Sequence, residues 1–276
     1  MSSADQIFIQ NCRDILESGV WDKEYNVRPR WEDGTPAYTK KKFGLVNRYD
    51  LSKEFPILTL RKINHTAAID ELLWIWQKRS NHVQDLGSHI WDAWANEEGS
   101  IGKAYGYQLS VMHHYREGMF NQVDRVLYDL KHNPSSRRII TNMYVHADLM
   151  DMALYPCAYS MTYNVSGKKL NGILNQRSND MLTANNWNVA QYAVLLHMFA
   201  RVSGLEAGEL VHVIADAHIY DRHIPLVEEL IEKEPLPAPV FSMDENVHDF
   251  YDFRVDSFSF DDYRFHPFGK KIEVAI

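Results

Sequence analysis

Three short segments in the middle of the chain carry the side chains best suited to chemistry. Tyr155-Pro156-Cys157 places a thiol directly after a proline, where a strand-like stretch begins. Two dense polar runs follow among apolar residues, one over 176–180 and one over 216–220. A free thiol near polar groups can act as a nucleophile, although an isolated cysteine more often packs in a core. Each polar run alone is more often a solvated loop, so only their combination suggests a site.

Charge limits what this site could bind. The chain has a formal net charge of -8, which argues against general affinity for nucleic acid, because polyanion binding depends on clustered lysine and arginine. A small phosphorylated ligand needs only a few arginines. Arg137, Arg138 and Arg177 are candidates for such a cluster.

Length and composition indicate a cytoplasmic globular protein. The chain has 276 residues, of which 45% are hydrophobic and 24% charged, and no apolar run approaches the ~20 residues that span a bilayer. Its start has no basic region followed by an apolar core. The two cysteines, Cys12 and Cys157, are too few for a disulfide framework and lack a CxxC partner, so we expect no metal site.

The elements that must position these residues belong to an α+β fold. Apolar residues at helical spacing predict helices over 3–18, 65–79, 121–132 and 188–203. Segments rich in β-branched and aromatic residues predict strands over 43–51, 139–145, 159–165, 169–176, 209–214 and 250–255. The two kinds of element do not alternate regularly, and no linker marks a boundary. We therefore expect one domain, residues 1–276, in which helices pack on a sheet.

Eight short runs together resemble the thymidylate synthase family. They are Glu71-Leu72-Leu73-Trp74, Ile90-Trp91-Asp92-Ala93-Trp94, Tyr105-Gly106, Ser136-Arg137-Arg138-Ile139-Ile140, Pro156-Cys157, Gln176-Arg177-Ser178-Asn179-Asp180, Trp187-Asn188-Val189 and His218-Ile219-Tyr220. Each run is weak alone, but all occur in that family's order and spacing, from about Arg28 to Ile276. The resemblance implies a mixed β-sheet covered by helices, and a homodimer formed through the sheet face.

The same resemblance implies reductive methylation of deoxyuridylate (dUMP) by 5,10-methylenetetrahydrofolate, with Cys157 as the nucleophile. Thiolate addition at uracil carbon 6 makes carbon 5 nucleophilic toward the methylene group. A guanidinium favours the thiolate, which is the catalytic role expected of Arg177 beside phosphate binding.

Three further residues are expected to act on the base. The amide of Asn188 can donate to uracil oxygen 4 and accept from ring N3–H, and the other reading of this asparagine is a helix cap. Glu71 lies among apolar residues that would raise its pKa, which suits proton transfer through water near oxygen 4. The resemblance gives Tyr105 a supporting role in that transfer.

Phosphate and sugar contacts follow from the same resemblance. Arg177 binds the phosphate, Ser178 supports it, and Arg137 and Arg138 reach it from the other subunit of the dimer. A loop arginine also contributes, and we prefer Arg28 to Arg30.

His218 and Tyr220 stand two apart in an extended stretch, so they share a face and could bind the deoxyribose 3′-hydroxyl.

The resemblance also implies a folate subsite. Asp180 would pair with the pterin ring, and Trp91 and Trp94 would supply apolar surfaces for it. The last residues, Ala275 and Ile276, resemble a tail that closes over the site and excludes water.

The sequence departs from the family pattern at several positions. Ala158 follows the nucleophile, where many members have histidine, and Ala184 replaces a common glycine. Ala217 replaces a common cysteine, and Arg61 stands where lysine is usual. None of these changes removes the thiol, the phosphate arginines or the base-reading amide.

Two other functions fit parts of the sequence. A deoxyuridylate hydroxymethylase shares the covalent steps but lets water capture the methylene group. A catalytically silent relative that binds nucleotide or RNA would not need the thiol, so the presence of Cys157 favours an enzyme.

Overall fold

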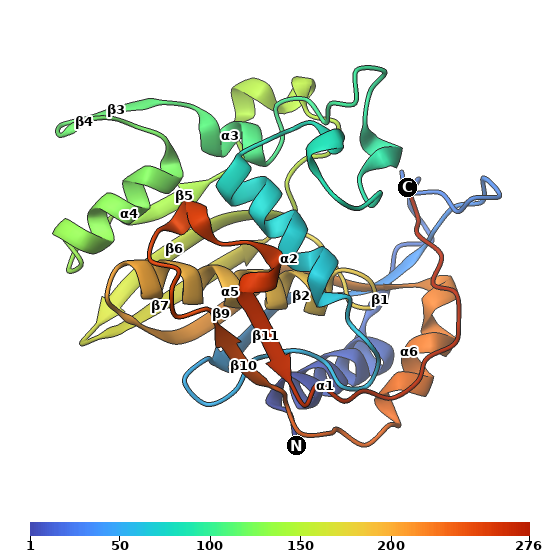
Figure 1. Ribbon diagram of the computed structural model, residues 1–276. Coiled ribbons are helices and arrows are strands. Elements are labelled where there is room, and N and C mark those ends of the chain that lie inside the picture. The colour runs from blue at the N-terminus through green and yellow to red at the C-terminus, as the bar shows by residue number, and fades with distance from the viewer.

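The computed structural model describes all residues, 1–276. Its main element is a seven-stranded sheet (Figure 1) in the order β1 (Val20–Trp21), β2 (Thr39–Asp50), β9 (Glu206–Tyr220), β7 (Lys169–Gln176), β6 (Ala158–Ser166) and β5 (Ile140–Asn142). The short strand β8 (Asn179–Asp180) pairs with β9. β7 and β8 run parallel to β9 and the other pairs are antiparallel. The sheet is therefore mixed, as the sequence predicted.

Helices cover one face of this sheet. α5 (Asn185–Val202) is the central one, and most of its side chains are buried. It packs so closely on β7 that a Cβ on Gly172 would lie 2.9 Å from the side chain of Leu196. α1 (Ser3–Ser18) covers β2 on the same face, where Asn11 donates to Asn47. Ser2 caps α1 by accepting from the backbone of Asp5.

The opposite face of the sheet carries apolar side chains that no helix covers. Val46 pairs with Val213, and Ile173 pairs with Val211, so these four residues share a face. Val46 is 58% exposed and Ile173 is 40% exposed. A contiguous apolar surface on a sheet is typical of a protein–protein interface.

The remaining elements surround this two-layer centre. They are α2 (His65–Leu73), α3 (Gly106–Ser110), α4 (Gln122–His132), α6 (Ile224–Ile231) and two hairpins, β3 (His113–Tyr115) with β4 (Gly118–Phe120) and β10 (Val240–Met243) with β11 (Phe258–Asp261). The β3–β4 hairpin projects from the molecule (Figure 1). α2 packs against α5 and continues into a π-helical turn, Trp74–Lys78, which ends where Arg79 takes a left-handed φ of 53°.

Four predicted helices and five predicted strands are confirmed, most of them with shifted ends. The predicted strand over 250–255 is wrong, because this segment forms 3-10 turns at Phe250–Asp252 and Val255–Ser257. Its two phenylalanines fill the core individually instead of alternating in a strand. Phe250 stacks on Phe199, with ring centroids 4.7 Å apart, and Phe253 stacks on Phe258 at 5.4 Å.

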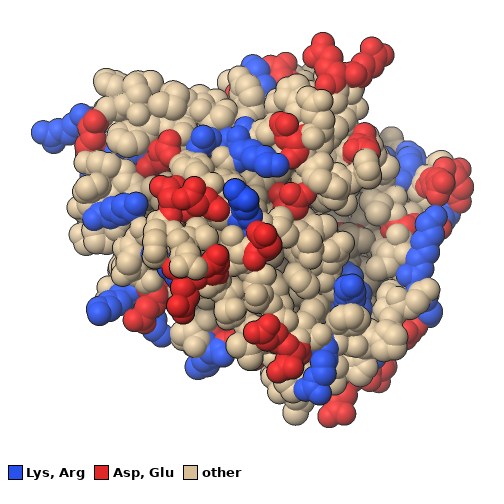
Figure 2. Space-filling model, viewed as in Figure 1, with Lys and Arg blue, Asp and Glu red and all other residues tan.

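The surface carries both signs of charge. On the face drawn in Figure 2, acidic and basic side chains intermingle. None of the helices has the length and apolar composition needed to cross a membrane.

Candidate active site

A cavity of about 670 Å³ opens where the carboxyl end of β7, the start of β6, α2 and α5 meet. This volume is within the usual range for small-molecule sites. All but two of the residues that the sequence nominated line it: Arg28, Glu71, Trp91, Trp94, Tyr105, Cys157, Arg177, Ser178, Asp180, Asn188, His218, Tyr220, Ala275 and Ile276. The exceptions are Arg137 and Arg138, which are exposed and do not line the cavity of this chain.

Cys157 lies immediately before β6, held between two neighbours. Its backbone N–H donates to the Tyr105 hydroxyl at 3.0 Å, and its carbonyl accepts from the backbone N–H of Arg177 at 2.9 Å. The Arg177 Nη2 lies 3.6 Å from the Cys157 Sγ. Burial raises the pKa of this thiol, and the charge of Arg177 opposes the rise only in part. The free site therefore holds mainly the thiol, beside a cation that can stabilise the thiolate once it forms.

Arg177 is fixed in place by the turn before the nucleophile. Its Nε donates to the Pro156 carbonyl at 3.1 Å and its Nη2 to the Tyr155 carbonyl at 2.6 Å. A guanidinium has five N–H groups, and no bond occupies Nη1 of Arg177. This nitrogen can therefore donate to an anionic ligand.

Glu71 lies at the base of the cavity, and three N–H groups point at its carboxylate. Trp91 Nε1 donates to one oxygen at 2.5 Å. Trp187 Nε1 and Gln191 Nε2 donate to the other, each at 2.6 Å. Burial raises the pKa of Glu71 and the three donors lower it, with burial prevailing. The expectation that an apolar setting raises this pKa is thus confirmed. A carboxyl group whose pKa is set by such opposing effects is suited to taking up and releasing a proton.

Tyr105 reaches the thiol from a strained turn. Its φ is +45°, a region that residues other than glycine rarely adopt. The next residue must be glycine, since a Cβ on Gly106 would lie 2.2 Å from the Ser80 carbonyl oxygen. The hydrogen bond from the Cys157 backbone N–H fixes the hydroxyl in place, and burial raises the pKa of Tyr105 well above its ordinary value, so the hydroxyl remains protonated.

Asn188 lies in α5, with both ends of its amide bonded. Its Oδ1 accepts from Gln176 Nε2 at 2.9 Å, and its Nδ2 donates to Gln191 Oε1 at 3.2 Å. The alternative reading as a helix cap is wrong, because α5 begins at Asn185 with Ala184 in the capping position. Since an amide has two donor hydrogens and two acceptor lone pairs, one of each is left for a ligand.

His218 and Tyr220 both line the cavity from β9, and the prediction that they share a face is confirmed. Their ring centroids are 5.2 Å apart. The Nδ1 of His218 lies 2.9 Å from Asp216 Oδ1, which orients the ring. A smaller cavity of about 300 Å³ adjoins this edge and is lined by Arg28, Arg177, Ser178 and His218 among others.

The loop at residues 28–35 distinguishes the two candidate arginines. Arg28 lines both cavities, whereas Arg30 Nη1 donates to the Val27 and Pro29 carbonyls of its own loop. The structure therefore places Arg28, and not Arg30, toward the site.

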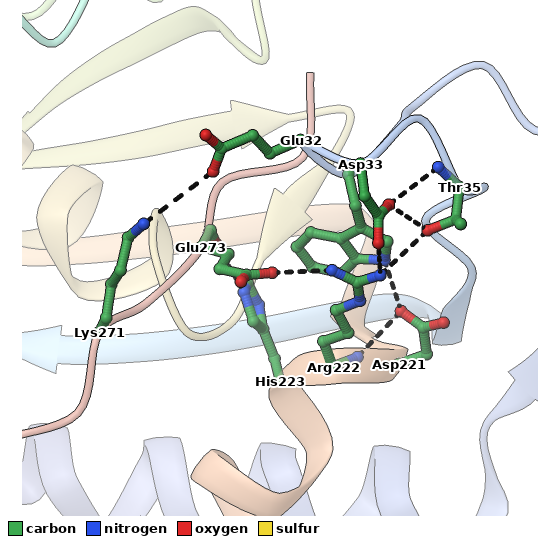
Figure 3. A network of polar contacts seen from close by, with 9 residues as sticks. Glu32, Asp33, Thr35, Asp221, Arg222, His223, Lys271 and Glu273 are labelled. Carbon is green, nitrogen blue, oxygen red and sulfur yellow. Dashed lines mark hydrogen bonds and ion pairs between the residues drawn. The ribbon is translucent and has the colours of Figure 1, made fainter.

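The C-terminal tail closes one side of the cavity by pairing with this loop. Ile276 and Arg30 exchange two backbone hydrogen bonds, at 2.8 and 3.0 Å. In the network of Figure 3, Arg222 connects the two segments, donating to Glu273 of the tail at 3.0 Å and to Asp33 of the loop at 2.6 Å. The Glu273 carbonyl also lies 2.8 Å from Nε2 of His223. Loop and tail are thus joined into one wall.

The aromatic side of the cavity is formed by Trp91 and Trp94. The Trp91 ring packs edge-on against Trp94 at 5.5 Å and against Tyr105 at 5.3 Å. Asp180, also in the lining, accepts from Leu182 N and from the hydroxyl of Thr183. Burial would raise the pKa of Asp180, but nearby histidines and these hydrogen bonds lower it, so the carboxylate is ionised.

Sequence reasoning missed several residues that hold the site together. Gln191 and Trp187 bind Glu71, His212 binds Gln176, and Arg222 joins loop and tail. Gln191 is three residues after Asn188 on a predicted helix, and this spacing could have identified it. His212 and Arg222 act through contacts between distant segments, which no local pattern reveals.

Three comparisons with known proteins agree with this site. The family model described as thymidylate synthase matches residues 6–276. The chain is 45% identical to thymidylate synthase of Bacillus licheniformis and 43% identical to thymidylate synthase 1 of Bacillus subtilis strain 168, each over the full length of both proteins. Among solved structures it resembles thermostable thymidylate synthase A from Bacillus subtilis, with a TM-score of 0.95 and 42% identity over 99% of each chain.

Proposed function

The chain belongs to the thymidylate synthase family and methylates deoxyuridylate, and we propose that the cavity around Cys157 is where it does so. One observation carries this proposal. Of the two cysteines, only Cys157 is partly exposed; it lies 3.6 Å from the Arg177 guanidinium and lines one cavity with the Asn188 amide and the buried Glu71 carboxyl group.

In the proposed mechanism the Cys157 thiolate forms a bond to uracil carbon 6, and the ring electrons move to oxygen 4 as an enolate. Carbon 5 then attacks the methylene group of 5,10-methylenetetrahydrofolate and breaks one of its two carbon–nitrogen bonds; the second breaks when tetrahydrofolate leaves. Loss of the carbon 5 proton and release of tetrahydrofolate leave an exocyclic methylene. Hydride from that tetrahydrofolate reduces the methylene, and the S–C6 bond breaks. The products are thymidylate and dihydrofolate, and the Cys157 thiolate is regenerated.

Asn188 and Glu71 recognise and protonate the base in this proposal. The free donor of Asn188 meets oxygen 4 and its free lone pair meets N3–H, which is the pattern of uracil. Glu71 exchanges a proton with oxygen 4 through water, as its balanced pKa allows. Tyr105 holds the nucleophile, and its protonated hydroxyl is a candidate, with water, for relaying the proton that leaves carbon 5.

The nucleotide phosphate binds between Arg28, Arg177 and Ser178, where the two cavities adjoin. His218 and Tyr220 contact the deoxyribose. Asp180, Trp91 and Trp94 bind the pterin ring of the folate, and the tail residues Ala275 and Ile276 cover it.

A homodimer completes the site. Arg137 and Arg138 are exposed and lie outside their own chain's cavity, so we propose that they reach the phosphate site of a second copy. The uncovered apolar face of the sheet, with Val46 and Ile173, supports an interface of this kind. Within each copy, residues 1–276 act as one domain.

The cytoplasm suits this chemistry, since a nucleophilic thiol must remain reduced and Cys157 is unpaired. We propose that location for the protein.

One assay tests the proposed reaction. Protein incubated with dUMP and methylenetetrahydrofolate should release dihydrofolate, detected as an absorbance increase, in step with thymidylate. Cys157→Ser is the control and should release neither. Formation of 5-hydroxymethyl product with tetrahydrofolate would instead indicate that water captures the methylene group.

A further inference from the structure

A fully buried histidine lies behind the cavity. His212, on β9, has no exposed surface, and its Nε2 is 2.7 Å from Gln176 Oε1. Its other nitrogen, Nδ1, has no hydrogen-bond partner. Burial lowers the pKa of His212 to about 3, so the ring is neutral and carries one proton. The structure must therefore select one of two tautomers.

This histidine ends a chain of amide hydrogen bonds that passes through the base-reading residue. Gln176 Nε2 donates to Asn188 Oδ1 at 2.9 Å, and Asn188 Nδ2 donates to Gln191 Oε1 at 3.2 Å. At the far end, Gln191 Nε2 donates to the Ala68 carbonyl at 3.0 Å. Each amide in this series donates from its nitrogen and accepts at its oxygen, in Gln176, Asn188 and Gln191 alike.

The donor-to-acceptor direction of these hydrogen bonds is set by the one group that cannot act as a donor. The Ala68 carbonyl can only accept, so the nitrogen of Gln191 must face it. The Gln191 oxygen then faces Asn188, which must present its nitrogen, and the Asn188 oxygen faces Gln176. Turning any one amide over would place two donors or two acceptors against each other, which is costly because Gln176 and Gln191 are buried.

The tautomer of His212 follows from this direction. Gln176 uses its nitrogen toward Asn188 and therefore offers its oxygen to His212, which must donate from Nε2–H. A second observation, the strand register, agrees. Asn47, the register partner of His212, has an amide nitrogen without a partner, and this donor complements Nδ1 only in the same tautomer.

No other side chain fixes Gln176 from the β6 side. Its cross-strand partner there is Ala158, whose side chain has no polar atom. The oxygen of Gln176 therefore depends on His212 for its donor.

We propose that His212, as the Nε2–H tautomer, is a positioning residue that acts through Gln176 to hold the Asn188 amide in the orientation that selects uracil over cytosine. Uracil offers an acceptor at oxygen 4 and a donor at N3–H, whereas cytosine offers a donor at its amine and an acceptor at N3. The two orientations of an asparagine amide match one base each. This inference rests on the proposed role of Asn188 as the residue that reads the base.

Two variants distinguish the effect of the His212 hydrogen-bond donor from the effect of its packing. His212→Phe keeps a ring of similar size but has no donor, and His212→Gln keeps an N–H donor. Titration calorimetry with dUMP and dCMP gives the ratio of the two dissociation constants. We expect His212→Phe to reduce the preference for dUMP by about five- to tenfold, and His212→Gln to stay within about twofold of native.

The Asn188→Asp variant distinguishes failure of the inference about His212 from failure of the proposed role of Asn188. If it changes the ratio while His212→Phe leaves it at the native value, the inference is wrong and the role of Asn188 stands. If Asn188→Asp also leaves the ratio unchanged, Asn188 does not read the base, and the inference falls with it.

The tautomer can be measured on the native protein, even if His212→Phe does not fold. Long-range ¹H–¹⁵N correlation spectra distinguish protonated from unprotonated imidazole nitrogens, and the His212 signals are those missing from His212→Gln. We expect protonation at Nε2 alone between pH 6 and 8. A proton on Nδ1, or on both nitrogens, would overturn the inference.

Discussion

Trp187 offers the sharpest test of how Glu71 is controlled. Its indole N–H donates to the Glu71 carboxylate at 2.6 Å, and this contact lowers the pKa of Glu71. Trp187→Phe removes the donor. A hydrogen bond to a charged group contributes about 1.5–3 kcal/mol, and the lower figure applies because Trp187 is only partly buried. About 1.5 kcal/mol shifts the protonation equilibrium of Glu71 roughly tenfold toward the neutral acid.

The assay is the pH dependence of kcat. If the ionised carboxylate is the working form, the acidic limb of the profile moves up by about one pH unit in Trp187→Phe, while the rate at high pH changes little. Trp74→Phe is the control, because Trp74 is fully buried and its indole donates to the His82 carbonyl and not to Glu71. Both variants should lose stability, but only the first should move the limb. A limb that stays in place, or moves to lower pH, refutes this account of Glu71.

Three further predictions concern the dimer, the tail and the thiol. Mixing the inactive variants Cys157→Ser and Arg137→Ala/Arg138→Ala should restore about a quarter of native activity, because half the dimers are hybrids with one complete site each; verified hybrids without activity would show that the arginines act in their own chain. Glu273→Gln should raise the KM for methylenetetrahydrofolate about two- to fivefold, as expected for loss of a partly exposed ion pair. Lys271→Gln, at an exposed position, should leave this KM unchanged. Equal KM values for the two variants in steady-state assays would show that the tail contact does not contribute to folate binding. Iodoacetamide should alkylate Cys157 in the free protein with a rate that still rises above the ordinary thiol pKa of 9.0, since burial raises this pKa, and a plateau below pH 8 would contradict it.

Local patterns predicted the longer elements of the fold, and missed the helices α3 and α6 and most of the short strands. The amphipathic segment 3–18 coincides with α1, and the predicted strand 169–176 coincides with β7. The failure at 250–255 has a physical reason. Aromatic residues are common both in strands and in irregular segments that plug a core, and Phe250 and Phe253 do the latter.

The sequence predicted the residues that would contact the substrate, but not those that orient them. Cys157, Asn188 and Glu71 belong to short motifs, and the structure brings them into one cavity. The residues that orient them lie elsewhere in the chain. The role of His212 becomes visible only once β7 and β9 pair. That of Arg222 becomes visible only once the tail lies beside the loop at 28–35. Such contacts depend on tertiary structure, so a single sequence does not reveal them.

The central claim is that Cys157 adds to carbon 6 of the bound base. Incubation with 5-fluorodeoxyuridylate and methylenetetrahydrofolate tests this most directly, because fluorine cannot leave carbon 5 as a cation and the reaction stops at the covalent stage. We predict a ternary adduct that survives denaturation and that peptide mass spectrometry locates on Cys157, with none formed by Cys157→Ser. An adduct on another residue, or none in the native protein, would contradict the proposed mechanism.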